Sequence, residues 1–178
     1  MKHVYREYFK KHLTIMCSMN TQAAIYDDLD SKVLVSPVYD PRLIRDAHEI
    51  NVVCKNAYPF LFISDDYVDH KIKNCPEVTR ALTVYRNSGQ SSIFSFQGNT
   101  LMSAVGRNSC NYIMIFKQQT PKAWKNVIDE FLDMWLPLGM TLAQKIGYCK
   151  SVTADHSFFF IDNIEGSCHI CKLSASQI

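Results

Sequence analysis

Four neighbouring side chains have the chemistry to bind a metal ion. Asp65, Asp66, Asp69 and His70 offer carboxylate and imidazole donors, which suit a hard cation or a transition metal. Helix capping and a solvated loop are the more ordinary explanation of the same four residues. The sequence contains no GxSxG, HExxH, Walker or GxGxxG pattern. We therefore expect no catalytic residues and a protein that is not an enzyme.

A second candidate metal site is the CxxC spacing of Cys168 and Cys171. A structural zinc site needs four ligands, and Cys149 and His156 would complete one only if the chain folded back. Two packed or exposed thiols explain the pair as well, so we predict no bound metal.

The cysteines and the N-terminal residues bear on the compartment. The chain has seven cysteines, an odd number that does not form a disulfide framework. The charged N-terminal segment lacks the apolar stretch of a signal peptide, and no apolar run reaches the roughly 18 residues of a transmembrane helix. These features predict a cytoplasmic protein without a membrane partner.

The order of expected elements follows from apolar spacing and turn residues. With 47% hydrophobic residues, the chain of 178 residues can form one domain with a small appended module. Three strands are expected at 91–97, 100–106 and 111–117, paired as an antiparallel meander. The remaining expected elements are a helix at 3–17, a hairpin at 23–36, helical and loop segments at 40–87, and a long amphipathic helix from Pro121.

Two segments resemble parts of a PAS domain. NTQAAIYDDLDSKVLVSP resembles its first two strands, and SIFSFQGNTLMSAVGRNSCNYIMIFKQQT resembles its closing strands. The sequence departs from the family at Ser36-Pro37, where an asparagine is usual. The resemblance implies an α+β fold: a PAS-like antiparallel sheet flanked by helices, with a small helical C-terminal module. Residues 1–121 would form the sensory or dimerisation domain and residues 122–178 the linker and C-terminal module.

A PAS-like domain implies a cavity between its sheet and its helices. The candidates to line a ligand pocket there are Phe94, Phe96, Met102 and Met114. An ordinary filled core is the alternative, because methionine fills gaps in cores as readily as it lines sites. We expect no cofactor, and an unidentified small ligand in this pocket stays open.

The C-terminal third resembles the helix-turn-helix of LuxR/GerE-type regulators. Ala143, Gly147, Ser151, Thr153 and His156 occupy the places of that pattern, where the alanine allows close helix approach and the glycine a sharp turn. The module departs from the family in charge, since residues 122–178 contain five Lys or Arg against six Asp or Glu. Together the two resemblances imply a PAS–LuxR transcriptional regulator.

Such regulators bind promoter DNA as dimers. The residues implied as DNA-binding are those at the start of the second helix: Lys150, Ser151, Thr153, Ala154 and Ser157. A homodimer is expected through the N-terminal helix and the helix beginning at Pro121, which carries Trp124, Phe131 and Trp135.

One alternative remains open at this point. This alternative is a non-enzymatic adaptor domain that binds a small ligand or a protein and does not bind DNA. Residues 138–165 distinguish the two functions: two short helices joined by a tight turn favour the regulator, whereas burial of Phe158, Phe159 and Phe160 favours the adaptor.

Overall fold

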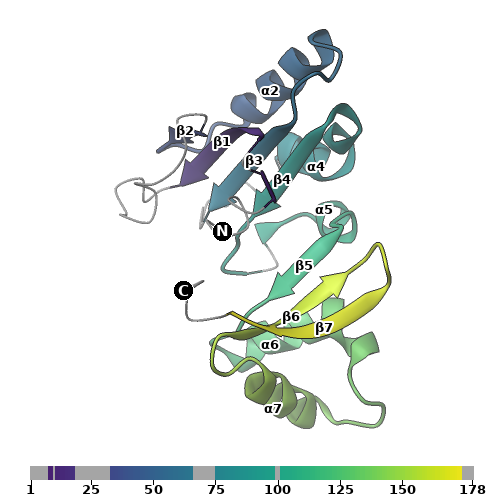
Figure 1. Ribbon diagram of the computed structural model, residues 1–178. Coiled ribbons are helices and arrows are strands. Elements are labelled where there is room, and N and C mark those ends of the chain that lie inside the picture. Colours follow the sequence, from purple (N-terminus) through teal and green to yellow (C-terminus); the bar gives the residue numbers. More distant parts are fainter. Residues whose placement is uncertain (1–7, 10, 19–32, 66–74, 99–100, 174–178) are drawn as a thin grey trace. The chain divides into compact units, whose positions relative to one another are not determined.

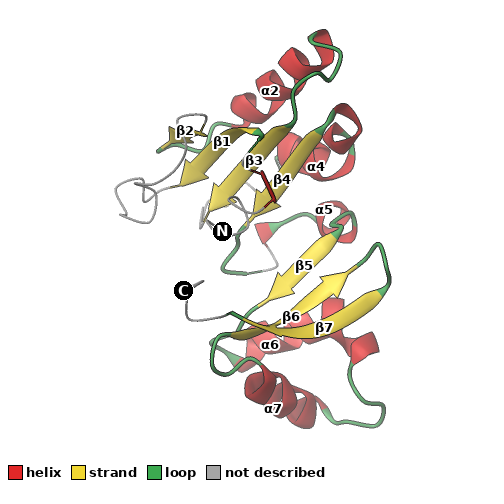
Figure 2. Ribbon diagram, viewed as in Figure 1, coloured by secondary structure: helices red, strands yellow, loops and turns green. Residues whose placement is uncertain are grey.

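The computed structural model describes residues 8–9, 11–18, 33–65, 75–98 and 101–173 (Figure 1). Contacts along the chain divide it into two compact units, residues 1–109 and 110–178. The first unit contains a parallel sheet and the second an antiparallel sheet, each accompanied by helices (Figure 2). The fold is therefore α+β. Within the described part of the chain, none of the helices is long and apolar enough to cross a membrane.

The first unit is built on four parallel strands in the order β2-β1-β3-β4. These strands are β1 (Leu13–Ser18), β2 (Val33–Ser36), β3 (Phe60–Asp65) and β4 (Gln90–Phe94). The first five residues of β3 are all buried, as expected for a central parallel strand that is covered on both faces.

Helices α2 (Pro41–Val53) and α4 (Pro76–Thr83) pack against each other and cover one face of this sheet. Each begins with a proline at its first position, and the Asp40 carboxylate accepts a hydrogen bond from the Arg42 amide at 2.9 Å. The short helices η3 (Tyr85–Ser88) and α5 (Ala104–Asn108) complete the described part of the unit. The core on this face consists of Cys17, Tyr39, Ile44, Phe62, Cys75, Val78, Ala81 and Tyr85.

The other face of the parallel sheet has its own apolar cluster. Met16, Leu61 and Ile63 are buried there, and Val33 and Ile93 pack against them. Successive residues of a strand point to opposite faces, so β1, β3 and β4 each supply apolar side chains to both clusters.

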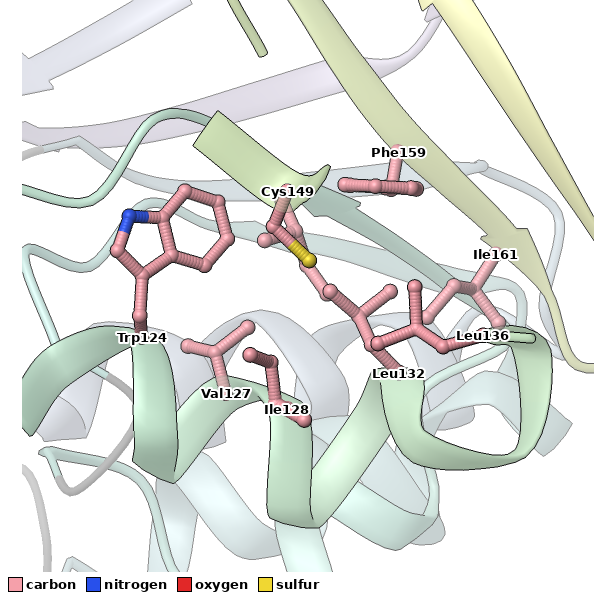
Figure 3. Close-up of a cluster of buried hydrophobic side chains, with 9 residues drawn as sticks. Trp124, Val127, Ile128, Leu132, Leu136, Cys149, Phe159 and Ile161 are labelled. Carbon is pink, nitrogen blue, oxygen red and sulfur yellow. The ribbon is translucent and has the colours of Figure 1, made fainter. Parts of the chain in front are cut away.

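The second unit is a three-stranded antiparallel sheet in the order β5-β6-β7. Its strands are β5 (Tyr112–Ile115), β6 (Ser157–Asp162) and β7 (Ser167–Lys172), and its helices are α6 (Pro121–Val127), η5 (Ile128–Leu132), η6 (Asp133–Trp135) and α7 (Leu142–Val152). The segment η5 is a π-helix. Helices and sheet enclose a core of Ile115, Trp124, Val127, Ile128, Leu132, Leu136, Cys149, Phe159 and Ile161 (Figure 3).

The expected PAS-like meander is not present. Strand β4 pairs in parallel with β3, residues 104–108 are helical, and β5 pairs with β6 in the second unit. Of the expected hairpin, residues 23–32 lie outside the described residues, and β2 pairs in parallel with β1. The expected helix at 3–17 is wrong over its described end, where residues 13–17 belong to β1.

The expected helix-turn-helix is also wrong. Helix α7 is followed by the positive-φ residues Asp155 (50°) and His156 (60°), which turn the chain sharply into β6. A second helix is excluded there because Ser157–Asp162 pairs with two neighbouring strands. The phenylalanines of this segment are therefore strand residues, and Phe158 and Phe159 are buried.

Candidate functional site

The order of the parallel strands points to one edge of the sheet. Strand β1 has β2 on one side and β3 on the other, so the chain reverses its direction across the sheet after β2. In doubly wound sheets of this order, ligands bind outside the carboxyl ends of the strands at the point of reversal. That point lies between the carboxyl ends of β1 and β3.

Three oxygen-bearing residues share one face at this edge. The strand register pairs Ser18 with Asp65, the last residues of β1 and β3. The pairing of Ser64 with Phe94 brings Ser95 level with Asp65, and the Ser95 amide donates to the Ser64 carbonyl at 2.9 Å. Since paired residues of parallel strands face the same way, Ser18 and Asp65 lie on one face, and Ser95, one residue beyond the end of β4, continues that face.

The donor set of this edge is one carboxylate and two hydroxyls. Hard oxygen donors are the ligands that Mg²⁺ prefers, and Mg²⁺ in proteins is typically bound through one or two carboxylates together with substrate phosphates. Ser18 is buried and Asp65 is half-buried, so the carboxylate stands where the sheet meets solvent. Gln97 follows on the segment that leaves β4, and it is exposed.

The opposite face of the same edge is less suited to chemistry. Ser64 is fully buried, and its hydroxyl has no hydrogen-bond partner among the described residues. Burial raises the pKa of the Cys17 thiol to about 11, although a backbone hydrogen bond from Asp40 works in the opposite direction. Because the thiolate is the reactive form, this burial disfavours Cys17 as a nucleophile.

The residues expected to line a pocket do not form one group. The rings of Phe94 and Phe96 stack with their centroids 5.9 Å apart, and both pack against the core under α2 and α4. Met102 is buried in the first unit, whereas Met114 lies on β5 in the second and is 46% exposed. A ligand at these residues stays a prediction.

The residues expected to bind DNA lie on different elements. Lys150 and Ser151 are exposed near the end of α7. Thr153 is buried, and its hydroxyl donates to the Cys149 carbonyl at 2.8 Å. Ala154 lies in the turn after α7, and Ser157 is the first residue of β6. Contact of these residues with DNA stays a prediction.

The structure argues against one of the two candidate metal sites and describes only part of the other. Cys168 pairs with Ile161 and Cys171 with Phe158, so the two thiols stand on opposite faces of β7 and cannot chelate one ion together. Asp66, Asp69 and His70 lie outside the described residues. In the part of the chain that the structure covers, no three His, Cys, Asp or Glu side chains are grouped as metal ligands.

No family model matches the sequence of this chain, and no curated protein sequence does. Solved structures do match: the genome-packaging NTPase B204 of Sulfolobus turreted icosahedral virus 2, in complex with AMP, has a TM-score of 0.67 at 16% identity, covering 97% of this chain and 91% of that one. The same NTPase with ATP-gammaS gives a TM-score of 0.65 at 17% identity, covering 96% and 89%.

A third similar structure is B204, the DNA-packaging ATPase of Sulfolobus turreted icosahedral virus, with a TM-score of 0.63 at 15% identity, covering 97% of this chain and 91% of that one. The chain shares the fold of these NTPases. The similarity extends over both units, because almost the whole of each chain is matched.

These findings correct the functional expectations. The parallel sheet and the similarity to packaging NTPases contradict the resemblance to PAS–LuxR regulators and the expected transcriptional function. The adaptor alternative is not supported either. The expectation of a protein that is not an enzyme is contradicted as well, because the structures that share the fold are NTPases.

The sequence contained two signals for this site. Two largely apolar runs, LTIMCS and FLFISD, have apolar residues at both odd and even positions. This is typical of parallel strands that are covered on both faces. Each run ends in a polar residue, Ser18 or Asp65. Asp65 was found as a candidate cation ligand, but Ser18 and Ser95 were missed because only the strand register brings them level with it.

Proposed function

We propose that this protein is ATPase-like and binds a nucleoside triphosphate with Mg²⁺ at the carboxyl edge between β1 and β3. The observation that carries the proposal is the placement of Ser18, Asp65 and Ser95 on one face at the reversal point of the sheet. Support comes from a fold shared with NTPases that were solved with AMP and ATP-gammaS.

Each residue of the edge has a role that follows from its chemistry. Bound Mg²⁺ would neutralise charge on the phosphates. Asp65 would hold the cation through its carboxylate, while the Ser18 and Ser95 hydroxyls would supply further oxygen ligands or donate to phosphate oxygens. Gln97 would lie beyond them with an amide that both donates and accepts, which suits a side chain that orients water.

The test is ATP binding by calorimetry and phosphate release in the presence of Mg²⁺. Replacing Asp65 by Asn should weaken binding by about tenfold or more, since a hydrogen bond or ligand contact to a charged group contributes about 1.5–3 kcal/mol. Asp46→Asn is the matched control, because Asp46 lies exposed on α2 beside Arg45. Equal binding by wild type and both variants would refute the proposed site.

DNA is the proposed partner. The support is that one protein of the same fold is a DNA-packaging ATPase. Phosphate release should therefore rise when double-stranded DNA is added, and the effect should fall with added salt because phosphate contacts release counterions. A homodimer stays a prediction that sedimentation can test. Trp124 is fully buried in the core of its own unit, so it offers no surface to a second chain.

A further inference from the structure

The antiparallel sheet of the second unit has one face that points away from its helices. Its inner face, which includes Ile115, Phe159 and Ile161, belongs to the core formed with α6 and α7 (Figure 2). Successive residues of a strand point to opposite faces. The outer face therefore carries the side chains of Tyr112, Met114, Phe116, Phe158, Phe160 and His169.

The aromatic rings of this outer face form two stacks that join β5 to β6. The rings of Tyr112 and Phe160 have their centroids 5.8 Å apart, and those of Phe116 and Phe158 are 5.0 Å apart. In each stack the ring on the β5 side is the more exposed one: Tyr112 is 54% exposed and Phe116 is 45% exposed. The two exposed rings lie four residues apart in the sequence, which is about 13 Å along a strand. Each is held in place by the ring beneath it, so little side-chain entropy is lost when a flat ligand stacks on it.

The charges near this face favour an anionic ligand at one end of the sheet. Lys117 and Lys172 are both exposed there. The strand register places both of them level with Ser157, the first residue of β6. The acidic residue of the outer face, Asp162, lies at the opposite end, and its carboxylate accepts hydrogen bonds from two backbone amides of the turn that follows it, at 2.9 and 3.0 Å.

Flat aromatic rings beside lysines fit the two parts of a nucleic-acid strand. Unpaired bases stack on exposed aromatic side chains, and lysines contact the phosphates. In a duplex each base is already stacked on its neighbours, so its flat face is not available to rings on a sheet. The outer face therefore fits a single strand better than a double strand.

We propose that the outer face of β5, β6 and β7 binds single-stranded DNA, with unpaired bases stacked on Tyr112 and Phe116 and the phosphates near Lys117 and Lys172. The choice of DNA rests on the proposed function, in which DNA is the partner. The stacking surface itself lies in the second unit and uses none of the residues of the proposed nucleotide site.

The experiment measures binding of a fluorescein-labelled oligothymidine to the full chain by fluorescence anisotropy, at several salt concentrations. Tyr112→Ala should weaken binding by about 5- to 150-fold, the range expected for the loss of one base–aromatic stack. Tyr112→Phe keeps the ring and should bind as wild type does. Tyr58→Ala is the matched control, because Tyr58 is 51% exposed and lies in the first unit. Lys117→Gln should weaken binding and reduce its dependence on salt.

The outcomes separate this inference from the proposed function. A labelled duplex should bind more weakly than the single strand, and a duplex that binds more tightly would overturn the inference. Equal binding by wild type, Tyr112→Ala and Phe116→Ala would also overturn it, and a change from dimer to monomer in those variants would then assign the face to a second copy of the chain. Calorimetry with ATP and Mg²⁺ on the same proteins tests the nucleotide site independently, because Tyr112→Ala should leave ATP binding unchanged.

Discussion

Gln90 is a buried polar side chain whose replacement should stabilise the protein. It begins β4, is 3% exposed, and neither its amide nitrogen nor its amide oxygen has a hydrogen-bond partner among the described residues. Leucine has a similar volume and no polar group to leave unsatisfied. Because an unsatisfied buried polar group costs about 1–3 kcal/mol, Gln90→Leu should raise the free energy of unfolding by about that amount.

The expected gain is large enough to measure by thermal unfolding. One kcal/mol shifts the melting temperature by about 2–4 °C in a chain of this size, so Gln90→Leu should raise it by about 2–12 °C. Gln119→Leu is the control, because Gln119 is exposed and its replacement should change the free energy of unfolding by less than about 0.5 kcal/mol. A lower melting temperature for Gln90→Leu would show that the amide is satisfied in the folded protein, and the reasoning would fail.

Three further predictions concern other parts of the fold. The Thr141 side chain caps α7, so Thr141→Ala should lower the free energy of unfolding in urea by about 1 kcal/mol, whereas Thr141→Ser should retain it. Leu132→Ala should cost about 2–5 kcal/mol in the same assay because the side chain is fully buried, while Leu138→Ala at an exposed position should cost less than about 0.5 kcal/mol. Burial and the hydrogen bond to Glu77 raise the pKa of Tyr85 from 10.0 to about 12, so its contribution to stability is complete below pH 10 and is lost as the pH rises towards 12. The melting temperature of Tyr85→Phe should therefore fall less than that of wild type over that pH range. An equal fall would contradict the raised pKa of Tyr85.

Local signals in the sequence predicted several elements well. Asp40 followed by Pro41 marks the start of α2, and Thr120 followed by Pro121 marks the start of α6. In both cases the cap and the proline act within one turn, so the cause lies in adjacent residues. The segment after Pro121 was expected to be helical, and Trp124, which was expected at a dimer contact, is fully buried in the core of its own unit.

Such local signals do not determine which strands pair or whether they pair in parallel. The apolar run of β4 fits an antiparallel or a parallel neighbour, and only contact with the distant β3 decides between them. In the expected antiparallel meander, neighbouring strands end at opposite edges of the sheet. The sequence therefore did not indicate that the carboxyl ends of the strands lie together at one edge. The site could therefore be found only in part: Asp65 has a local signal, but its neighbours Ser18 and Ser95 are brought level with it by pairings across the sheet.

The parallel sheet also affects the order in which the chain can fold. Leu13 pairs with Phe60, whereas Asp162 pairs with Ser167 across a tight turn. Contacts that close long loops form more slowly than local ones. During synthesis β1 leaves the ribosome long before β3 and β4, so its apolar side chains wait without the strands that later cover them. We therefore expect the first unit to complete its sheet more slowly than the second, with the apolar side chains of β1 exposed until β3 and β4 have been made.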